Sequence, residues 1–174
     1  HITREDYDVR LLIDCVRHVQ DTYHVKVYLE PGEAVALNAG YLVTEVLDKV
    51  DNGIKTLILD ASAACHMPDV PYTPPLYGAQ IVADILKTQE IPKDAHFVYR
   101  LSSYTCLAGD IIGDYEFDHE INVGDRLIFM DMAIYSMVKN NTFNGMPLPS
   151  ISVLKDGKLS LIKSFGYEDF KCRL

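Results

Sequence analysis

The sequence lacks the features that mark membrane and secreted proteins. No apolar run approaches the ~18 residues that are needed to cross a bilayer. The first residues, His1-Ile2-Thr3-Arg4-Glu5-Asp6, have neither the apolar stretch nor the flanks of a signal peptide. We therefore expect a soluble, cytoplasmic protein that does not act on a membrane.

Basic residues are also few. The chain of 174 residues has 16 Lys and Arg against 25 Asp and Glu, which gives a net charge of −9. No cluster of Lys or Arg lies on any predicted element, so nucleic acid and anionic membrane are poor candidates for the main partner. An acidic chain is compatible with a cationic substrate, although most acidic proteins simply have solvated acidic surfaces.

Motifs for metals and for common catalytic sites are absent. The four cysteines, which are Cys15, Cys65, Cys106 and Cys172, form no Cys-x-x-Cys pair, so structural zinc is not expected. The chain also has no glycine-rich phosphate loop of the Walker or Rossmann type, no His-Glu-x-x-His and no serine elbow. These absences leave polar segments in loops as the candidates for chemistry.

The first forty residues predict one unit of an α/β barrel. Apolar residues at helical spacing predict a helix over Asp8–Gln20, and the alternation in His24–Leu29 predicts a strand. Glu30-Pro31-Gly32 ends that strand with a turn, at the position where α/β barrels carry active-site residues. A lone helix and strand would leave one face of the strand uncovered, so either the chain is a fragment of a longer protein or another chain completes the unit, and we expect the fragment.

The remaining residues, 41–174, predict a mostly β domain. Strands are expected over Leu42–Val50 and Lys55–Asp60, over Ala95–Leu101 and Arg126–Asp131, and over Ile151–Lys155 and Lys158–Lys163. The turns at Asn52-Gly53 and Asp156-Gly157 are typical of tight hairpins. Prolines exclude regular structure over Met67–Pro75, and apolar spacing predicts a short helix over Gly78–Lys87. The fold class is thus α/β plus β: residues 1–40 end a barrel and residues 41–174 form a second domain.

Four polar segments follow one another in an order that is specific. They are residues 30–41, 60–69, 106–114 and 124–149, and together they span most of the chain. In this order the segments resemble the C-terminal half of the alanine-racemase-type decarboxylases that use pyridoxal phosphate, which include diaminopimelate and ornithine decarboxylases. Within that group the resemblance is greatest to the carboxynorspermidine (carboxyspermidine) decarboxylases of polyamine synthesis.

The resemblance implies roles for particular residues. Glu30 would contact the ring nitrogen of pyridoxal phosphate and keep it protonated, which makes the ring a better electron sink. Tyr135, which alone would be interpreted as a packing residue, would bind the cofactor phosphate. Cys106 would protonate the reacting carbon of a site in the neighbouring subunit. Asp110 matches an acid in the subunit contact, so an obligate homodimer with shared active sites is implied.

Two departures from the relatives indicate the substrate. Glu33 stands where diaminopimelate and ornithine decarboxylases have an arginine, and a carboxylate there would attract an ammonium. Leu107 replaces the acid that grips the distal amino group in those enzymes. A longer cationic substrate, a carboxylated polyamine, fits both changes. Asp69 and Asp60 are candidates to hold its other nitrogens, although each could also be an ordinary loop or turn acid.

The alternatives stay open at this point. The lysine that carries the cofactor lies upstream of His1 in such enzymes, and none of Lys26, Lys49, Lys55 or Lys87 has a matching context. A diaminopimelate or related basic amino-acid decarboxylase is the competing enzyme. If the chain were complete as written, a non-catalytic β domain would be the other reading.

Overall fold

A computed structural model describes residues 7–68, 81–83 and 97–173 of the chain. The helices are α1 (Val9–Tyr23), α2 (Gly32–Ala36), α3 (Ala63–His66), α4 (Tyr135–Val138) and α5 (Tyr167–Lys171), with a 3-10 turn η2 (Phe143–Gly145). The strands are β1 (Tyr41–Asp51), β2 (Lys55–Leu59), β3 (Ile81–Ala83), β4 (Phe97–Ser103), β5 (Ile111–Phe117), β6 (Arg126–Met130), β7 (Ile151–Lys155) and β8 (Lys158–Lys163). Strands thus dominate residues 41–163.

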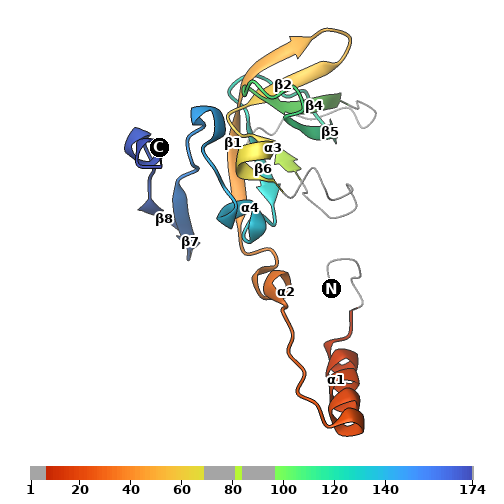
Figure 1. Ribbon diagram of the computed structural model, residues 1–174. Coiled ribbons are helices and arrows are strands. Elements are labelled where there is room, and N and C mark those ends of the chain that lie inside the picture. The colour runs from red at the N-terminus through yellow and green to blue at the C-terminus, as the bar shows by residue number, and fades with distance from the viewer. Residues whose placement is uncertain (1–6, 69–80, 84–96, 174) are drawn as a thin grey trace.

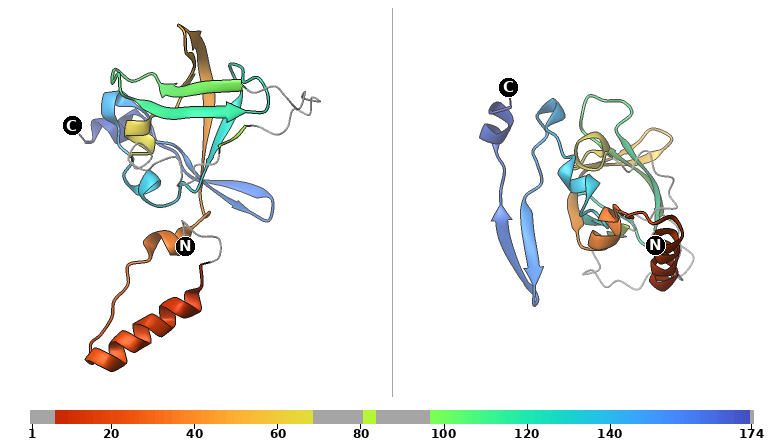
Figure 2. Two further views of the ribbon diagram at one scale, coloured as in Figure 1. Left: turned by 90° about the vertical axis from the view of Figure 1, so that its right-hand side faces the viewer. Right: turned by 60° about the horizontal axis from the view of Figure 1, so that its bottom comes forward.

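One curled, mixed sheet forms the body of the molecule (Figures 1 and 2). Its strand order is β3-β6-β1-β2-β4-β5. The long strand β1 pairs with β6 through its first half and with β2 through its second half, and the pairing shifts between Val46 and Asp48. A shift of this kind bends a strand and increases its twist, which lets one strand serve both halves of a curled sheet.

The core lies on the concave side of this sheet. It is built from alternate residues of the strands and from the segments that follow them. Its largest members that are almost wholly inaccessible are Tyr99, Phe129, Leu57, Leu59, Met67, Leu101, Ile121 and Leu127. Strand β2 contributes Leu57 and Leu59, β4 contributes Leu101 and β6 contributes Leu127. Because each of these leucines is fully buried, truncation of one to alanine would cost about 2–5 kcal/mol of folding free energy.

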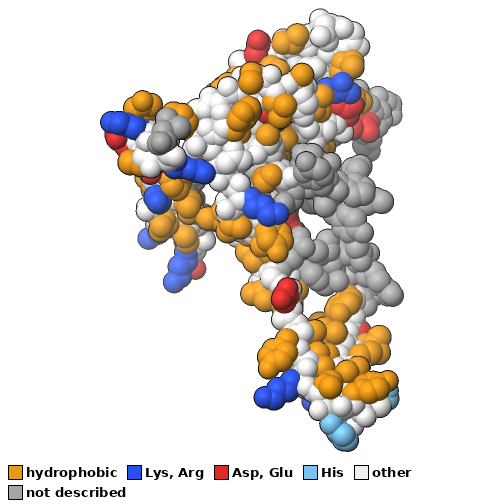
Figure 3. All heavy atoms as spheres, viewed as in Figure 1, with side chains coloured by type: hydrophobic (Ala, Val, Ile, Leu, Met, Phe, Trp, Pro, Cys, Tyr) orange, Lys and Arg blue, Asp and Glu red, His pale blue; other side chains and the backbone are white. Residues whose placement is uncertain are grey.

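Large apolar side chains are also exposed on α1 and on the β7–β8 hairpin. The hairpin stands apart from the curled sheet, and α1 projects below the sheet (Figures 1–3). Val9 and Leu11 of α1 are exposed, and so are Leu154, Leu159 and Leu161 of the hairpin. Apolar surface of this extent is typical of a face that packs against something else.

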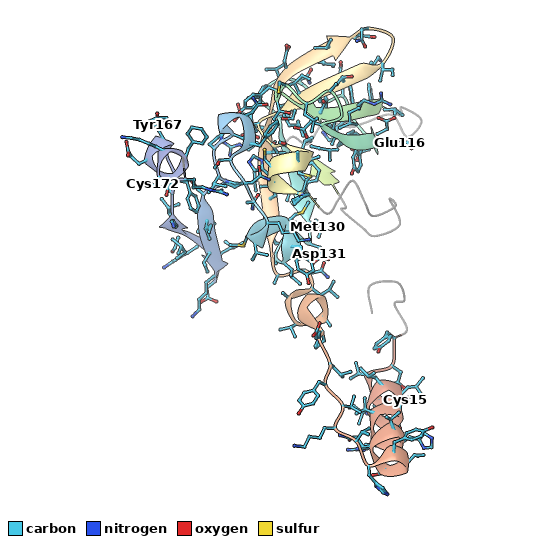
Figure 4. The ribbon with its side chains drawn as sticks, viewed as in Figure 1. Cys15, Glu116, Met130, Asp131, Tyr167 and Cys172 are labelled. Atoms are coloured by element: carbon cyan, nitrogen blue, oxygen red, sulfur yellow. The ribbon has the colours of Figure 1, made fainter. Side chains whose placement is uncertain are left out.

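The junction between α2 and the sheet is close and specific. Asp131, at φ +58°, accepts a 2.7 Å hydrogen bond from the backbone N–H of Asn38, and Met132 N–H donates to the carbonyl of Gly40. Figure 4 shows Asp131 where β6 ends, between the sheet and α2. A Cβ on Gly40 would come within 2.9 Å of Ala133, so this approach requires glycine.

Most of the predicted elements are confirmed. The helix over Asp8–Gln20 forms as α1, with the Asp8 carboxylate capping it through the N–H of Arg10 at 2.8 Å. The hairpins form where Gly53 and Gly157 were expected to turn the chain, and both glycines have positive φ. The strand predicted over Arg126–Asp131 is β6.

Two predicted elements are wrong. His24–Leu29 forms no strand: His24 takes the left-handed conformation at φ +52°, and no strand in the described part of the chain lies beside the segment to complete a ladder. Ile81–Ala83, predicted as helix, is β3 and pairs with β6, so tertiary pairing overrides its local apolar spacing. The rest of Gly78–Lys87 lies outside the described residues. Strand β5 and the short helices were not predicted.

Candidate functional site

Three loops meet at one edge of the sheet. Strands β2 and β4 are parallel, with Leu59 opposite Ser103, so the segments that follow them leave the sheet side by side. The first segment runs through α3 and the second, residues 104–110, contains Cys106. The third, residues 139–146, comes from the chain after α4 and joins them through hydrogen bonds. Three of the four polar segments seen in the sequence are therefore brought together here.

Asp110 ties the first two loops to each other. Its side chain is 2% exposed, and it accepts hydrogen bonds from Ser62 Oγ at 2.6 Å, from Thr105 Oγ1 at 2.5 Å and from the backbone N–H of Ala64 at 3.2 Å. Ser62 Oγ in turn accepts from the N–H of Cys65, which caps α3. The acid expected in a subunit contact thus has its carboxylate turned inward, where three donors of its own chain satisfy it.

Cys106 lies on an exposed stretch of the second loop. Residues 106–109 are all exposed, whereas Asp110 at the end of the loop is buried. The N–H of Cys106 donates to Asn144 Oδ1 at 3.1 Å, and the N–H of Asp110 donates to the carbonyl of Leu107 at 2.9 Å. The thiol is accessible, as a proton donor to a bound substrate has to be.

Cys65 contrasts with Cys106. It is buried, its Sγ lies 3.6 Å from the carbonyl of Phe143, and burial raises the pKa of its thiol above 9.0. Asn141 completes the contact of α3 with the third loop, since its backbone N–H donates to the carbonyl of Cys65 and its side-chain amide to that of Ala64. Cys65 is thus a packing residue, and Cys106 is the exposed cysteine of these three loops.

His66 is a buried and neutral part of the same framework. Its Nδ1 accepts from the N–H of Ser62 at 3.1 Å, so its Nε2 carries the proton and donates to the carbonyl of Pro147 at 3.0 Å. Burial lowers the pKa of His66 below 6.5, against smaller raising effects from Pro147, Asp60 and Asp110. The ring joins α3 to the segment that leads into β7.

Asp60 follows β2 at the same edge. Its Oδ1 accepts from the hydroxyl of Thr44 and from the N–H of Glu45, the latter at 2.8 Å. Tyr104, at the start of the Cys106 loop, has a hydroxyl whose pKa is raised mainly by burial. The charge of Asp60 raises the pKa of this hydroxyl further. One oxygen of Asp60 is thus engaged by β1, and the residue follows Leu59, which lies opposite Ser103, directly before the Cys106 loop.

Tyr135 begins α4, beyond the junction at Asp131. Its side chain is 55% exposed, and Lys139 Nζ lies 4.4 Å from the centre of its ring. The hydroxyl and the ammonium together make a cationic, hydrogen-bonding surface. The side-chain oxygen of Asn140, which ends this segment, is buried and has no donor in the described part of the chain.

The other predicted residues lie apart from these loops or cannot be placed. Glu30 is exposed on the segment between α1 and α2, and Figure 1 shows that this segment runs below the curled sheet. Glu33 is within α2, which approaches the sheet through Asn38 and Asp131. Asp69 lies outside the described residues. The structure therefore gathers Cys106 and Asp60 in one place and leaves Glu30 on a separate arm.

Candidate metal sites and membrane-spanning helices are both absent from residues 7–68, 81–83 and 97–173. No group of three or more His, Cys, Asp or Glu residues there is arranged to hold a metal ion. No helix there is long and apolar enough to span a bilayer.

Comparison with known sequences identifies the family. Residues 7–133 match the family described as the pyridoxal-dependent decarboxylase, C-terminal sheet domain. The match covers most of the chain and includes the curled sheet, α3 and the Cys106 loop. The chain therefore belongs to the family of pyridoxal-dependent decarboxylases and contains its C-terminal sheet domain.

Individual relatives narrow the comparison. A carboxynorspermidine/carboxyspermidine decarboxylase from Campylobacter jejuni is 42% identical over 99% of this chain and 47% of its own length. A carboxyaminopropylagmatine decarboxylase from Synechocystis is 40% identical over 99% of this chain and 44% of its own. The crystal structure of the carboxynorspermidine decarboxylase from Campylobacter jejuni, in complex with norspermidine, superimposes with a TM-score of 0.81 at 40% identity, over 99% of this chain and 48% of that one. The chain thus spans about half the length of these relatives.

Sequence reasoning missed the residues that hold the site together. Ser62, His66 and Asn144 were within segments that it singled out, but it gave them no role. Ser62 precedes the four-residue helix α3, and serine is a common N-cap residue. Its capping role could therefore have been predicted from the sequence. The partners of His66 and Asn144 are about 80 and 40 residues away along the chain, and no local pattern reports them.

Proposed function

We propose that the full-length enzyme decarboxylates carboxynorspermidine or carboxyspermidine with pyridoxal phosphate as cofactor. The observation that carries this proposal is the similarity over nearly the whole chain to a carboxynorspermidine/carboxyspermidine decarboxylase, at 42% identity. The TM-score of 0.81 to the norspermidine complex supports it. Diaminopimelate decarboxylases are more distant, at 27% identity for the enzyme from Aquifex aeolicus.

A cationic substrate is supported by the residues around the site. Glu33 on α2 and Asp60 beside the Cys106 loop are carboxylates with no Lys or Arg within four residues along the sequence. Each could bind an ammonium group of the substrate. Leu107 leaves the position after Cys106 uncharged. We assign Asp69 to the same task from the family resemblance alone.

The residues present fit a pyridoxal phosphate group. Exposed Glu30 can accept a hydrogen bond from a protonated ring nitrogen. Exposed Tyr135 could donate its hydroxyl proton to a phosphate, and Lys139, whose Nζ lies 4.4 Å from the centre of the Tyr135 ring, would add a positive charge next to this tyrosine. When bound, the cofactor supplies an electron sink for the bonding pair that is released as CO2 leaves.

Cys106 supplies the proton that completes the reaction. Loss of CO2 leaves an electron pair on the substrate carbon, and the Sγ–H of Cys106 donates a proton to that carbon. The exposed thiol can reach a substrate that lies against the loop, whereas the buried Cys65 cannot.

Lys49 plays no part, because its ammonium is paired with Glu120 at 2.6 Å and this hydrogen bond raises the pKa of Lys49 above 10.5.

The domain organisation and the assembly are part of the proposal. Residues 1–40 would end the barrel that binds the cofactor, and residues 41–174 would form the β domain of a homodimer with shared sites. The exposed apolar residues of α1 and the β7–β8 hairpin support this, since each element offers a face for further packing. The separation of Glu30 from the Cys106 loop supports sharing, because the two residues would meet only across subunits.

A substrate panel tests the proposal. The purified full-length enzyme is loaded with pyridoxal phosphate, and CO2 release is measured with carboxynorspermidine, carboxyspermidine, carboxyaminopropylagmatine, diaminopimelate and ornithine. We expect the highest kcat/KM for one of the two carboxylated triamines. Preference for diaminopimelate or ornithine would contradict the substrate assignment, and absence of all activity would contradict the enzyme assignment.

Carboxyaminopropylagmatine is the second candidate substrate. The decarboxylase from Synechocystis that acts on it is 40% identical to this chain, almost as similar as the relative from Campylobacter jejuni. Its tail ends in a guanidinium in place of an ammonium, and a carboxylate can bind both groups. A kcat/KM for this compound above those for both triamines would replace the first proposal with this one.

A further inference from the structure

We infer that Asp110 is a positioning residue that sets the place of the Cys106 thiol from inside the fold, through Thr105. The catalytic part of this inference rests on the proposed function, in which Cys106 donates a proton to the substrate. Thr105 directly precedes Cys106, and its hydroxyl donates to the Asp110 carboxylate at 2.5 Å. The same carboxylate is fixed to the neighbouring loop by Ser62 and by the N–H of Ala64.

The burial of Asp110 is costly and therefore informative. A carboxylate that is 2% exposed loses most of its hydration, and only well-placed donors offset that loss. Here all three donors come from two loops that meet at the site, and the carbonyl of Asp110 also accepts from Ser102 Oγ at 3.0 Å. The carboxylate thus joins the start of α3 to the Cys106 loop, and the carbonyl of the same residue adds the end of β4.

The loop has little else to hold it. Residues 106–109 are exposed, and the side chain of Leu107 is 47% exposed, so apolar burial does not fix the position of the thiol. The fixed points are Thr105 before the thiol, Asp110 after it and the bond from the Cys106 N–H to Asn144. A proton donor that is displaced by about 1 Å loses much of its effect, so these fixed points bear on the rate.

The chain supplies graded variants and a matched control. Thr105→Val removes one hydroxyl from the carboxylate at nearly constant shape, and Thr105→Ser keeps the hydroxyl. Asp110→Asn removes the buried charge. Asp114→Asn is the control, because Asp114 is exposed on β5 and binds Arg100 in a surface ion pair with bonds of 2.7 and 2.9 Å.

The experiment measures kcat and KM of the full-length holoenzyme and, separately, the rate at which iodoacetamide modifies Cys106, followed by peptide mass spectrometry. For Thr105→Val we expect kcat to fall about tenfold or more, the effect of one lost hydrogen bond to a charged group, with KM little changed. Cys106 modification should become faster because the loop is released. Thr105→Ser should keep the wild-type kcat and the wild-type rate of Cys106 modification. Asp110→Asn should change both quantities more than Thr105→Val does. The control Asp114→Asn should match the wild type in both.

The two readouts separate this inference from the proposed function. Unchanged kcat and unchanged modification rate in Thr105→Val would overturn the positioning role, and so would a Thr105→Ser variant that behaves like Thr105→Val. If the wild-type enzyme decarboxylates none of the substrates, the proposed function fails. The modification rate of Cys106 then still decides whether Asp110 and Thr105 hold the loop.

Discussion

The backbone N–H of Cys106 donates to the side-chain oxygen of Asn144 at 3.1 Å, and Asn144 itself adopts a φ of +59°. Asparagine tolerates this left-handed conformation better than most residues, and its short side chain is then free to accept. Asn144 thus fixes the Cys106 loop from the third loop of the site.

Replacement of Asn144 tests this contact. Asn144→Ala removes the acceptor and adds backbone strain, so we expect the free energy of unfolding to fall by about 1–2 kcal/mol. Asn144→Gly removes the acceptor without strain and should be less destabilised. Denaturant unfolding and steady-state kinetics measure both effects. Because both variants lack the acceptor, kcat should fall to a similar extent in each; a normal kcat in Asn144→Gly would show that the bond does not position Cys106.

Glu33 is predicted to select a cationic substrate. Reversal of its charge in Glu33→Arg should lower kcat/KM for carboxynorspermidine by about tenfold or more, since an attraction becomes a repulsion. Asp118→Arg is the control, because exposed Asp118 follows β5 at the end away from the Cys106 loop. An equal loss in both variants would mean that only the net charge of the enzyme matters.

A mixing experiment tests whether the active site is shared. Cys106→Ala and Glu30→Ala enzymes should each be nearly inactive. If Cys106 and Glu30 act in one site from different subunits, a heterodimer contains one intact site. Random reassociation of equal amounts should then recover about a quarter of the wild-type activity, as a symmetric dimer requires. No recovery, with heterodimers demonstrated by native mass spectrometry, would place both residues in the same subunit's site.

Buried His66 predicts a loss of stability in mild acid. Because the pKa of His66 in the folded state is lowered below 6.5, the unfolded chain binds a proton at mildly acidic pH that the folded chain does not bind. The contribution of His66 is therefore fully present above pH 6.5 and is lost as the pH falls below it. Thermal unfolding between pH of about 7.5 and 5.5 measures this slope.

Two variants isolate the contribution of His66. His66→Gln should be less stable at neutral pH by about 1–3 kcal/mol, since two buried hydrogen bonds are disturbed, but its stability should depend less on pH. His119→Gln, which alters a surface histidine beside Asp118, should keep the wild-type slope. The same slope in His66→Gln and the wild type would exclude His66 as its source.

Local signals predicted much of this fold. The turn at Asp156-Gly157 and the cap at Asp8 depend on neighbouring residues, and both are confirmed. Strand β5 was missed because Gly113 and the charged residues around it hide the alternation, although Ile112 and Phe117 are buried. Ile81–Ala83 was misjudged because its strand partner, β6, lies more than forty residues away.

The site was predictable as segments but not as a network. The order of the polar segments led to Cys106 and Asp60, and the parallel pairing of β2 with β4 then brings them to one edge. The inward carboxylate of Asp110 was not foreseeable, because its donor Ser62 lies 48 residues earlier and a loop acid is usually solvated. Long-range hydrogen bonds leave no periodic trace in a sequence.

The central claim is that Cys106 donates the proton in the decarboxylation of a carboxylated triamine. The most direct measurement is kcat of the Cys106→Ala holoenzyme with carboxynorspermidine, with Cys172→Ala, which removes another exposed thiol, as the control. We predict that kcat falls about a hundredfold or more, while cofactor absorbance and the Cys172→Ala control stay at wild-type values. A Cys106→Ala enzyme with wild-type kcat would contradict the account.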